Sequence, residues 1–316
     1  MLEVVDLFCG AGGLSLGLRQ SGLCIRAAFD SGAACIATYN KNFRGVKAIV
    51  ADIRSLKASD ILKHVASRDN LVLAGCPPCQ LFSQLHRRKK SVGAEFNSYL
   101  RLIWSIRPAY IVFENVPRIV DRPDAWDALQ HRLDRCGYHV AYKVVTSDQL
   151  GVPQRRIRMV LLAAKTPIQI PSIVPTAPRT VRETIEHLPE ADGTIPNHVT
   201  MALSAKNLKR IQSTMHDGGR SKLSNVPFDD SYARMAWDKP APTITTRCVS
   251  FSNGRFGHPV FDRAITVREA AYLQGFPSEF IFSGGVWETA RQVGNAVPPP
   301  LAKWLGSLIG RHYQVG

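Results

Sequence analysis

The sequence is poor in acidic residues for its length of 316. It has 25 Asp and Glu against 40 Lys and Arg, which gives a formal net charge of +15 at pH 7 and a pI near 9.8. This excess of positive charge favours a polyanionic partner, and nucleic acid is the usual one. Charge alone leaves open the alternative of a basic surface without a partner.

Long apolar runs, repeats and paired cysteines are also missing. No apolar run is long enough to span a bilayer, and no basic segment precedes the first apolar run, so we expect neither a membrane anchor nor a secretion signal. The seven cysteines are odd in number and scattered, which argues for free thiols in a reducing compartment and against a disulfide framework. We expect no metal site.

Short apolar runs alternate with amphipathic stretches through the first half of the chain. The expected strands are Glu3–Phe8, Cys24–Phe29, Lys47–Ile53, Leu71–Gly75, Ala109–Phe113, Tyr138–Val145 and Arg156–Ala164. The expected helices include Gly13–Gln20, Ser59–Ser67 and Phe96–Ile106. This alternation predicts an α/β fold with a doubly wound, Rossmann-like parallel sheet.

The composition changes after Lys165. Four prolines follow at positions 167, 171, 175 and 178, and the chain stays rich in turn signals until about His258. Residues 206–222 carry five basic side chains and one acidic one. We therefore predict a main domain over residues 1–165, a smaller irregular domain over 166–258, and a return to the main domain over 259–316.

Cys79 lies in a rigid turn after the expected strand Leu71–Gly75. Pro77 and Pro78 precede it and fix two φ angles of the backbone. The carboxyl edge of an open α/β sheet is where ligands bind, so a thiol held there is a candidate nucleophile. A buried structural cysteine is the alternative for this residue taken by itself.

A glycine-bearing turn follows the first expected strand, in the run Asp6–Leu14. Its glycines allow close approach of a ligand to the backbone, although Ser15 stands where a dinucleotide pattern would have a third glycine. Asp30 ends the second expected strand, where an acid can bind a ribose diol, and Asp52 ends the third. Three such positions on consecutive strands favour a nucleoside-containing cofactor over a plain strand–helix turn.

Two further groups of polar residues lie at expected strand ends. Glu114 ends the fifth strand, which we expect beside the strand that leads to Cys79, and a desolvated carboxyl there can give a proton to a ring nitrogen. Arg156 and Arg158 are expected on one face of the seventh strand, where two guanidinium groups can hold a carbonyl and a carboxylate. A helix-capping carboxylate and a solvated basic face are the respective alternatives.

The order of these motifs resembles that of the DNA cytosine-5 methyltransferases. The matching residues run from Asp6–Leu14 through Pro78-Cys79-Gln80, Glu114-Asn115-Val116, Gln154-x-Arg156-x-Arg158, Arg268-Glu269 and Gln274–Pro277 to Gln292–Pro298. The resemblance covers residue 3 to about residue 304. It implies a DNA (cytosine-5-)-methyltransferase that uses S-adenosylmethionine and releases S-adenosylhomocysteine, with its target recognition domain between Lys165 and about His258.

The resemblance also implies a role for each matching residue. Cys79 attacks carbon 6 of a flipped-out cytosine, Glu114 acts at ring N3, Arg158 holds the O2 atom and Arg156 supports the site. The cofactor-binding positions are Phe8, Gly10, Ala11, Gly12, Gly13, Leu14, Asp30, Ser31, Asp52, Ile53, Pro78 and Asn295. Asp30 replaces the commoner glutamate and Ser31 the often apolar or aromatic residue, while Cys76 replaces the commoner glycine and creates a Cys-Pro-Pro-Cys run.

Basic and polar residues outside these motifs are candidates for duplex DNA contacts. A long basic loop follows the thiol, and glycine-bearing loops lie within the smaller domain. The candidates are Ser83, Arg87, Arg88, Lys89, Lys90, Lys209, Arg220, Thr243, Arg247 and Arg255. We expect lysines to meet phosphates and Arg220, Arg247 and Arg255 to contact guanine.

The expected protein is a monomer that acts on duplex DNA in a restriction-modification system, with a cognate restriction endonuclease as a partner. It would be cytoplasmic in a prokaryote and nuclear in a eukaryote. Three alternatives are an RNA cytosine methyltransferase, a catalytically silent paralogue, and a dithiol oxidoreductase built on Cys76 and Cys79. The last leaves Glu114, the arginines and the basic charge unexplained.

Overall fold

The computed structural model describes residues 1–78, 93–222 and 231–315. The chain divides into two compact units. Unit 1 comprises Met1–Thr146, Ile157–Val174 and Pro299–Gly316, and unit 2 comprises Ser147–Arg156 and Pro175–Pro298. Residues up to Pro298 thus belong to the second compact unit, whereas the sequence pattern assigned residues from 259 onward to the main domain. Which unit performs which function stays a prediction.

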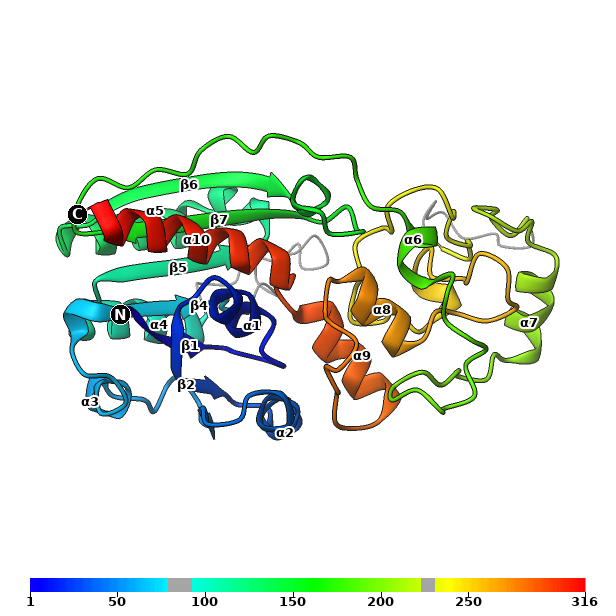
Figure 1. Cartoon of the computed structure of the whole chain (residues 1–316), viewed down its shortest axis with the longest axis horizontal. Coiled ribbons are helices and arrows are strands. Elements are labelled where there is room, and N and C mark those ends of the chain that lie inside the picture. Colours follow the sequence, from blue (N-terminus) through cyan, green and yellow to red (C-terminus); the bar gives the residue numbers. More distant parts are fainter. Residues whose placement is uncertain (79–92, 223–230, 316) are drawn as a thin grey trace. The chain divides into compact units, whose positions relative to one another are not determined.

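Unit 1 is built on a sheet with the strand order β3-β2-β1-β4-β5-β7-β6 (Figure 1). Its strands are β1 (Glu3–Leu7), β2 (Cys24–Asp30), β3 (Lys47–Val50), β4 (Leu71–Gly75), β5 (Tyr110–Asn115), β6 (His139–Thr146) and β7 (Ile157–Ala164). The expected α/β fold is confirmed. The strands β1 to β5 are parallel, as the alternation in the first half of the chain predicts, while β7 runs antiparallel to both β5 and β6. The ten residues between β6 and β7 are fewer than a parallel crossover requires.

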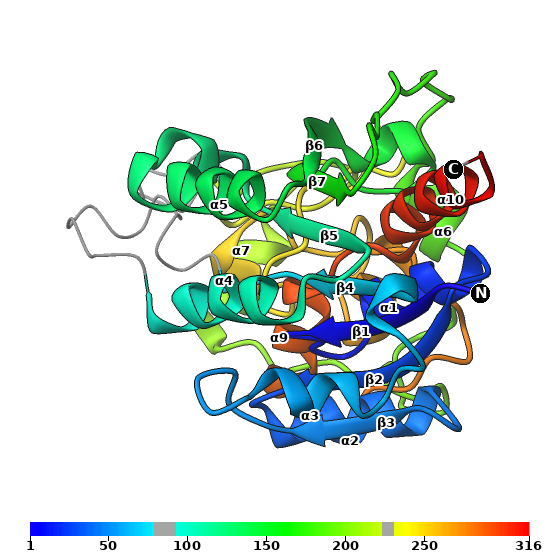
Figure 2. The same cartoon turned by 90° about the vertical axis from the view of Figure 1, so that its left-hand side faces the viewer.

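Helices cover both faces of this sheet (Figures 1 and 2). They are α1 (Gly13–Gln20), α2 (Ala33–Asn42), α3 (Ala58–Leu62), α4 (Ala94–Ile106), α5 (Pro123–Arg135) and α10 (Pro299–Val315). Side chains of α3, α4 and α5 pack with alternate residues of the strands in one apolar core. The helices α1 and α10 pack against each other on the opposite face.

The central strands are buried on both faces. All five residues of β4 and all six of β5 are buried, which explains why both appear in the sequence as nearly continuous apolar runs. The strands β1, β2, β4 and β5 are parallel neighbours, so their carboxyl ends meet at one edge of the sheet. That edge holds the candidate site.

Unit 2 is irregular. Its helices are α6 (Val181–Ile185), α7 (Ala205–Gln212), α8 (Val267–Leu273) and α9 (Val286–Asn295), and its described residues form isolated bridges rather than strands. The buried guanidinium of Arg234 organises it by donating to the carbonyl oxygens of Ile211, Thr214, His258, Val260 and Phe261. An ion pair with Asp262 completes this set. This one side chain thus connects residues 211–214 with residues 258–262.

Among the described residues, no helix combines the length and the apolar character that crossing a membrane would require.

Candidate active site and cofactor cavity

The turn after β1 takes an unusual backbone path. Phe8, Gly10 and Gly12 all have positive φ angles, of 60°, 53° and 100°. A Cβ atom on Gly12 would lie 2.5 Å from a carbon of the Phe43 ring, whereas one on Gly10 would meet nothing within 4 Å. Gly12 is therefore required by both conformation and space, while Gly10 is favoured by its conformation.

Asp30 holds this turn from the end of β2. One carboxylate oxygen, Oδ2, accepts a hydrogen bond from the backbone N–H of Gly10 at 2.9 Å, and Oδ1 accepts from Gly32 N–H at 2.8 Å. Each carboxylate oxygen has a further lone pair. Asp30 can thus shape the glycine turn and still accept hydrogen bonds from a ligand, as the sequence pattern predicts.

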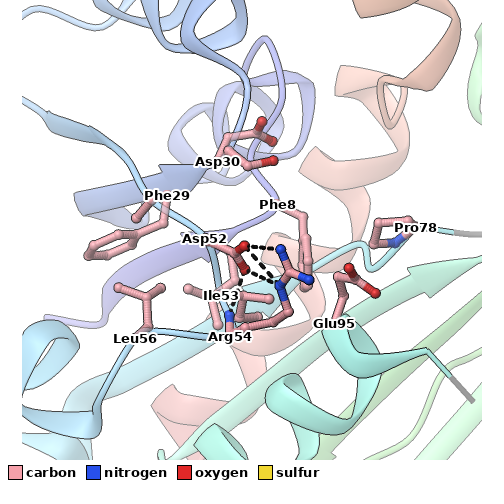
Figure 3. A pocket seen from close by; sticks show the side chains of 12 residues that line it. Phe8, Phe29, Asp30, Asp52, Ile53, Arg54, Leu56, Pro78 and Glu95 are labelled. Carbon is pink, nitrogen blue, oxygen red and sulfur yellow. Dashed lines mark hydrogen bonds and ion pairs between the residues drawn. The ribbon is translucent and has the colours of Figure 1, made fainter.

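A cavity of about 200 Å³ opens at this edge of unit 1 (Figure 3). It is lined by Leu7, Phe8, Phe29, Asp30, Ser31, Ala51, Asp52, Ile53, Arg54, Leu56, Pro78 and Glu95. Six of the predicted cofactor-binding residues therefore line one cavity, namely Phe8, Asp30, Ser31, Asp52, Ile53 and Pro78. Arg54 and Glu95 also line it, and no sequence motif singled them out.

Asp52 is already engaged in this cavity. Arg54 Nε lies 2.8 Å from Asp52 Oδ2 and 3.0 Å from Oδ1, and the Arg54 backbone N–H donates to Oδ1 at 2.8 Å (Figure 3). These hydrogen bonds hold the pKa of Asp52 below its usual value. An adenine amino group would share this carboxylate with Arg54.

A buried carboxyl, that of Asp6, lies on the strand before the glycine turn. Asp6 Oδ2 accepts a hydrogen bond from the Ser15 hydroxyl at 2.6 Å, and Ser15 Oγ accepts from the Tyr39 hydroxyl at 2.8 Å. Burial raises the pKa of Asp6 to about 7, and the Ser15 hydrogen bond opposes that shift only in part. Ser15 therefore provides Asp6 with a hydrogen-bond donor, which a glycine at position 15 could not do.

Glu114 forms the centre of the candidate catalytic group. It is buried near the end of β5, and the Cys76 thiol donates to its Oε2 at 2.8 Å. Arg158 Nε lies 3.1 Å from Oε1 as an ion pair, yet Oε1 accepts no hydrogen bond from the described residues. The structure thus joins Glu114 with Arg158, and it leaves one buried carboxylate oxygen able to accept a hydrogen bond.

The Pro-Pro turn is held by the neighbouring residue of β5. Asn115 is buried, and its Nδ2 donates to the carbonyl oxygen of Pro77 at 3.1 Å. The predicted neighbourhood of the two strands is confirmed, because β4 and β5 pair in parallel. Cys79 itself lies outside the described residues, so its position relative to Glu114 stays a prediction.

Arg156 has a different environment from Arg158. It lies one residue before β7, whereas Arg158 lies within that strand, so the expectation that both share one face of the strand stays a prediction. The Arg156 guanidinium is buried in unit 2 and donates to the carbonyl oxygens of Ile244 at 3.0 Å and Gly294 at 3.1 Å. Arg156 therefore supports backbone beside Thr243 and Asn295.

Gln154 reinforces the same part of unit 2. Its Oε1 accepts from the backbone N–H of Ile244 at 2.9 Å, and its Nε2 donates to Leu273 O at 3.2 Å and to the Gln274 side chain. Gln274 in turn donates to the carbonyl oxygens of Val293 and Ala296. Motifs far apart in the sequence thus meet in one hydrogen-bonded cluster.

The candidate DNA-contacting residues are either exposed or outside the described part of the chain, with Thr243 as a partly buried exception. Ser83, Arg87, Arg88, Lys89 and Lys90 lie outside the described residues. Lys209, Arg220, Arg247 and Arg255 are exposed in unit 2, and Asn295 is exposed at the end of α9. Thr243 Oγ1 donates to Arg155 O at 2.9 Å.

A seven-stranded sheet whose β6 and β7 are antiparallel, with a glycine turn after β1 and an acid ending β2, has the architecture of a methyltransferase. Residues 2–311 match the family model of the C-5 cytosine-specific DNA methylases. The chain belongs to this family, and it is a DNA (cytosine-5-)-methyltransferase. Membership of the family implies a methyl donor of the S-adenosylmethionine type and a DNA substrate.

Curated relatives agree with this assignment, and a solved structure shares the fold. The chain is 36% identical to the type II methylase M.HgiDII of Herpetosiphon aurantiacus, over 98% of this chain and 95% of that protein. It is 31% identical to the type II methyltransferase M1.HphI of Haemophilus parahaemolyticus, over 98% and 86%. Its fold matches the crystal structure of the S. pombe Dnmt2 methyltransferase with a TM-score of 0.72, at 21% identity and 99% coverage of each chain.

Proposed function

We propose that this enzyme transfers the methyl group of S-adenosylmethionine to carbon 5 of a cytosine flipped out of a specific duplex DNA sequence, through a covalent bond between Cys79 and carbon 6. The observation that carries the proposal is the buried Glu114 carboxyl. It is paired with Arg158, its Oε1 accepts no hydrogen bond from the described part of the chain, and it lies on the strand beside the one that leads to Cys79.

The chemistry needs such a group because carbon 5 of cytosine is a weak nucleophile. Addition of the Cys79 thiolate to carbon 6, with a proton supplied to N3 by Glu114, gives an enamine whose carbon 5 can attack an electrophilic methyl group. Loss of the carbon 5 proton then expels the thiolate. Arg158, which pairs with Glu114, stabilises the carboxylate that Glu114 becomes. We also assign to Arg158 the binding of the cytosine O2.

The cavity residues fit the proposed cofactor, which supplies a methyl group bound to a positively charged sulfur. Phe8, Ile53 and Pro78 offer apolar surface for a base, and Asp30 offers carboxylate oxygens for ribose hydroxyls. The carboxylates of Asp30, Asp52 and Glu95 also suit a cation. The roles of Ser31, Asn295 and the turn residues Gly10–Leu14 stay predictions.

The residues that would recognise DNA are a further part of the proposal. The base must leave the duplex, because the edge atoms of a stacked base cannot reach a thiol at a sheet edge. We assign sequence recognition to residues 166–258, with exposed Arg220, Arg247 and Arg255 as base contacts and Lys209 as a phosphate contact. The relatives named as type II methylases support action beside a cognate restriction endonuclease.

Substitution of Glu114 by Gln tests the catalytic role. The amide keeps the shape of the carboxyl but cannot give a proton in the same way, so single-turnover methyl transfer should slow by roughly 10²–10⁴-fold. Cofactor and DNA binding, measured by calorimetry and gel shift, should stay close to those of the wild type. An unchanged single-turnover rate would refute the assignment of Glu114.

A further inference from the structure

The thiol of Cys76 contacts the candidate proton donor directly, although the role of this residue is not part of the mechanism proposed above. Its Sγ lies 2.8 Å from Glu114 Oε2 and donates to it. The contact crosses from the residue after β4 to a residue in β5. Glycine, the residue commoner at this position among the proteins that the chain resembles, could not make it.

The backbone fixes the position of this thiol on both sides. Cys76 follows the last buried residue of β4 and precedes Pro77. A residue before proline is restricted to the extended region, so the φ and ψ angles of Cys76 are restricted too. The Pro77 carbonyl is held in turn by Asn115 Nδ2 at 3.1 Å. The approach of Sγ to Glu114 is therefore built into the main chain and does not depend on a long, flexible side chain.

The two oxygens of Glu114 are consequently unlike. Oε2 receives the thiol hydrogen bond, whereas Oε1 faces Arg158 Nε at 3.1 Å without accepting a hydrogen bond from the described residues. A donor on one oxygen fixes the plane of the carboxyl and leaves the other oxygen as the natural acceptor or proton carrier. Burial of the whole side chain, which is 2% exposed, prevents water from taking over this function.

We propose that Cys76 is a positioning residue for Glu114: its thiol orients the carboxyl for proton transfer to the cytosine ring. The inference rests on the catalytic role proposed for Glu114. A thiol is a weak donor, so we expect its loss to slow methyl transfer by about 3- to 10-fold, well below the effect of removing Glu114.

The experiment compares single-turnover methyl transfer to duplex DNA at one fixed pH for the wild type and four variants. Cys76→Ala and Cys76→Gly both remove the thiol, so the result does not depend on the folding of one of them. Cys76→Ser retains a donor and should stay within about twofold of the wild-type rate. Cys24→Ala, at the opposite end of β2 from Asp30, is the matched thiol control and should behave as the wild type.

A double-mutant cycle separates positioning from a general structural effect. If Cys76 acts through Glu114, then Cys76→Ala should cause no further loss of rate in a Glu114→Gln background. The inference is overturned if the thiol-free variants match the wild-type rate, if Cys76→Ser is as slow as Cys76→Ala, or if the additional loss persists in that background. A wild-type rate for Glu114→Gln alone would instead overturn the proposed function.

Discussion

At the scale of single residues, the contacts of Ser15 explain why this position departs from the glycine motif. The sequence pattern lacks the third glycine of a dinucleotide-binding turn, and the structure places the Ser15 hydroxyl 2.6 Å from the buried Asp6 carboxyl. A polar group that is removed from water is stable only with a partner. Ser15, which departs from the glycine pattern, thus gives the buried Asp6 carboxyl a hydrogen-bond donor. The glycine pattern by itself does not indicate this need.

Asp6 should make folding stability depend on pH. Its pKa of about 7 lies above the usual value of 3.8, so the folded protein retains a proton that the unfolded chain has already released. The free energy of unfolding should therefore fall by a few kcal/mol between about pH 4 and pH 7. In Asp6→Asn, urea titrations followed by circular dichroism should show a weaker fall over this range, and an identical fall in both proteins would contradict the assignment.

Other residues of the site differ in how far sequence could predict them. Glu114 and Arg158 were expected near the thiol because each belongs to a recognisable motif at a strand end. The contacts of Asp52 with Arg54 and of Glu114 with Cys76 were not, because they depend on side-chain directions that no spacing rule fixes. Arg54, Glu95 and Cys76 therefore entered the site only with the structure.

At the scale of elements, the clearest signals gave the most accurate boundaries. The apolar run of β4 and the amphipathic α1 have the ends that the pattern predicts. The third strand ends at Val50, before the expected Ile53, because Asp52 and Arg54 form a turn there. The helix α2 lies between two expected strands, where the alternation predicts a helix without fixing its ends.

Gly12 and Gly10 provide a matched test of the turn after β1. Gly10→Ala should cost about 1 kcal/mol, the usual penalty for a side chain in a left-handed conformation. Gly12→Ala should cost about 3 kcal/mol or more, because overpacking against the Phe43 ring adds to the backbone strain. Urea unfolding measures both values, and equal losses for the two variants would mean that the turn has a different conformation.

At the scale of the whole molecule, composition predicted the division into a regular and an irregular part but not its limits. The proline cluster after Lys165 lies where the chain passes from the first compact unit to the second. The second unit also includes Ser147–Arg156 and the helices α8 and α9. Hydrogen bonds such as those of Gln154 and Arg156 create this grouping. They join residues far apart in sequence, so local patterns do not reveal them.

Exchange of residues 166–258 tests the assignment of sequence recognition. If these residues are replaced by the corresponding segment of a relative that modifies a different site, the chimera should methylate the site of the donor. Bisulfite sequencing of treated genomic DNA maps the modified cytosines. Recognition would lie elsewhere in the chain if an active chimera still modified the original site.

The central claim is that Cys79 forms a covalent bond with the target cytosine. The most direct measurement incubates the enzyme with S-adenosylmethionine and a duplex that carries 5-fluorocytosine at the mapped target position, followed by denaturing electrophoresis. Fluorine at carbon 5 cannot leave as a proton does, so the thiol stays attached. The account predicts a denaturation-resistant complex for the wild type and for Cys76→Ser and none for Cys79→Ser, and a complex that survives in Cys79→Ser would contradict it.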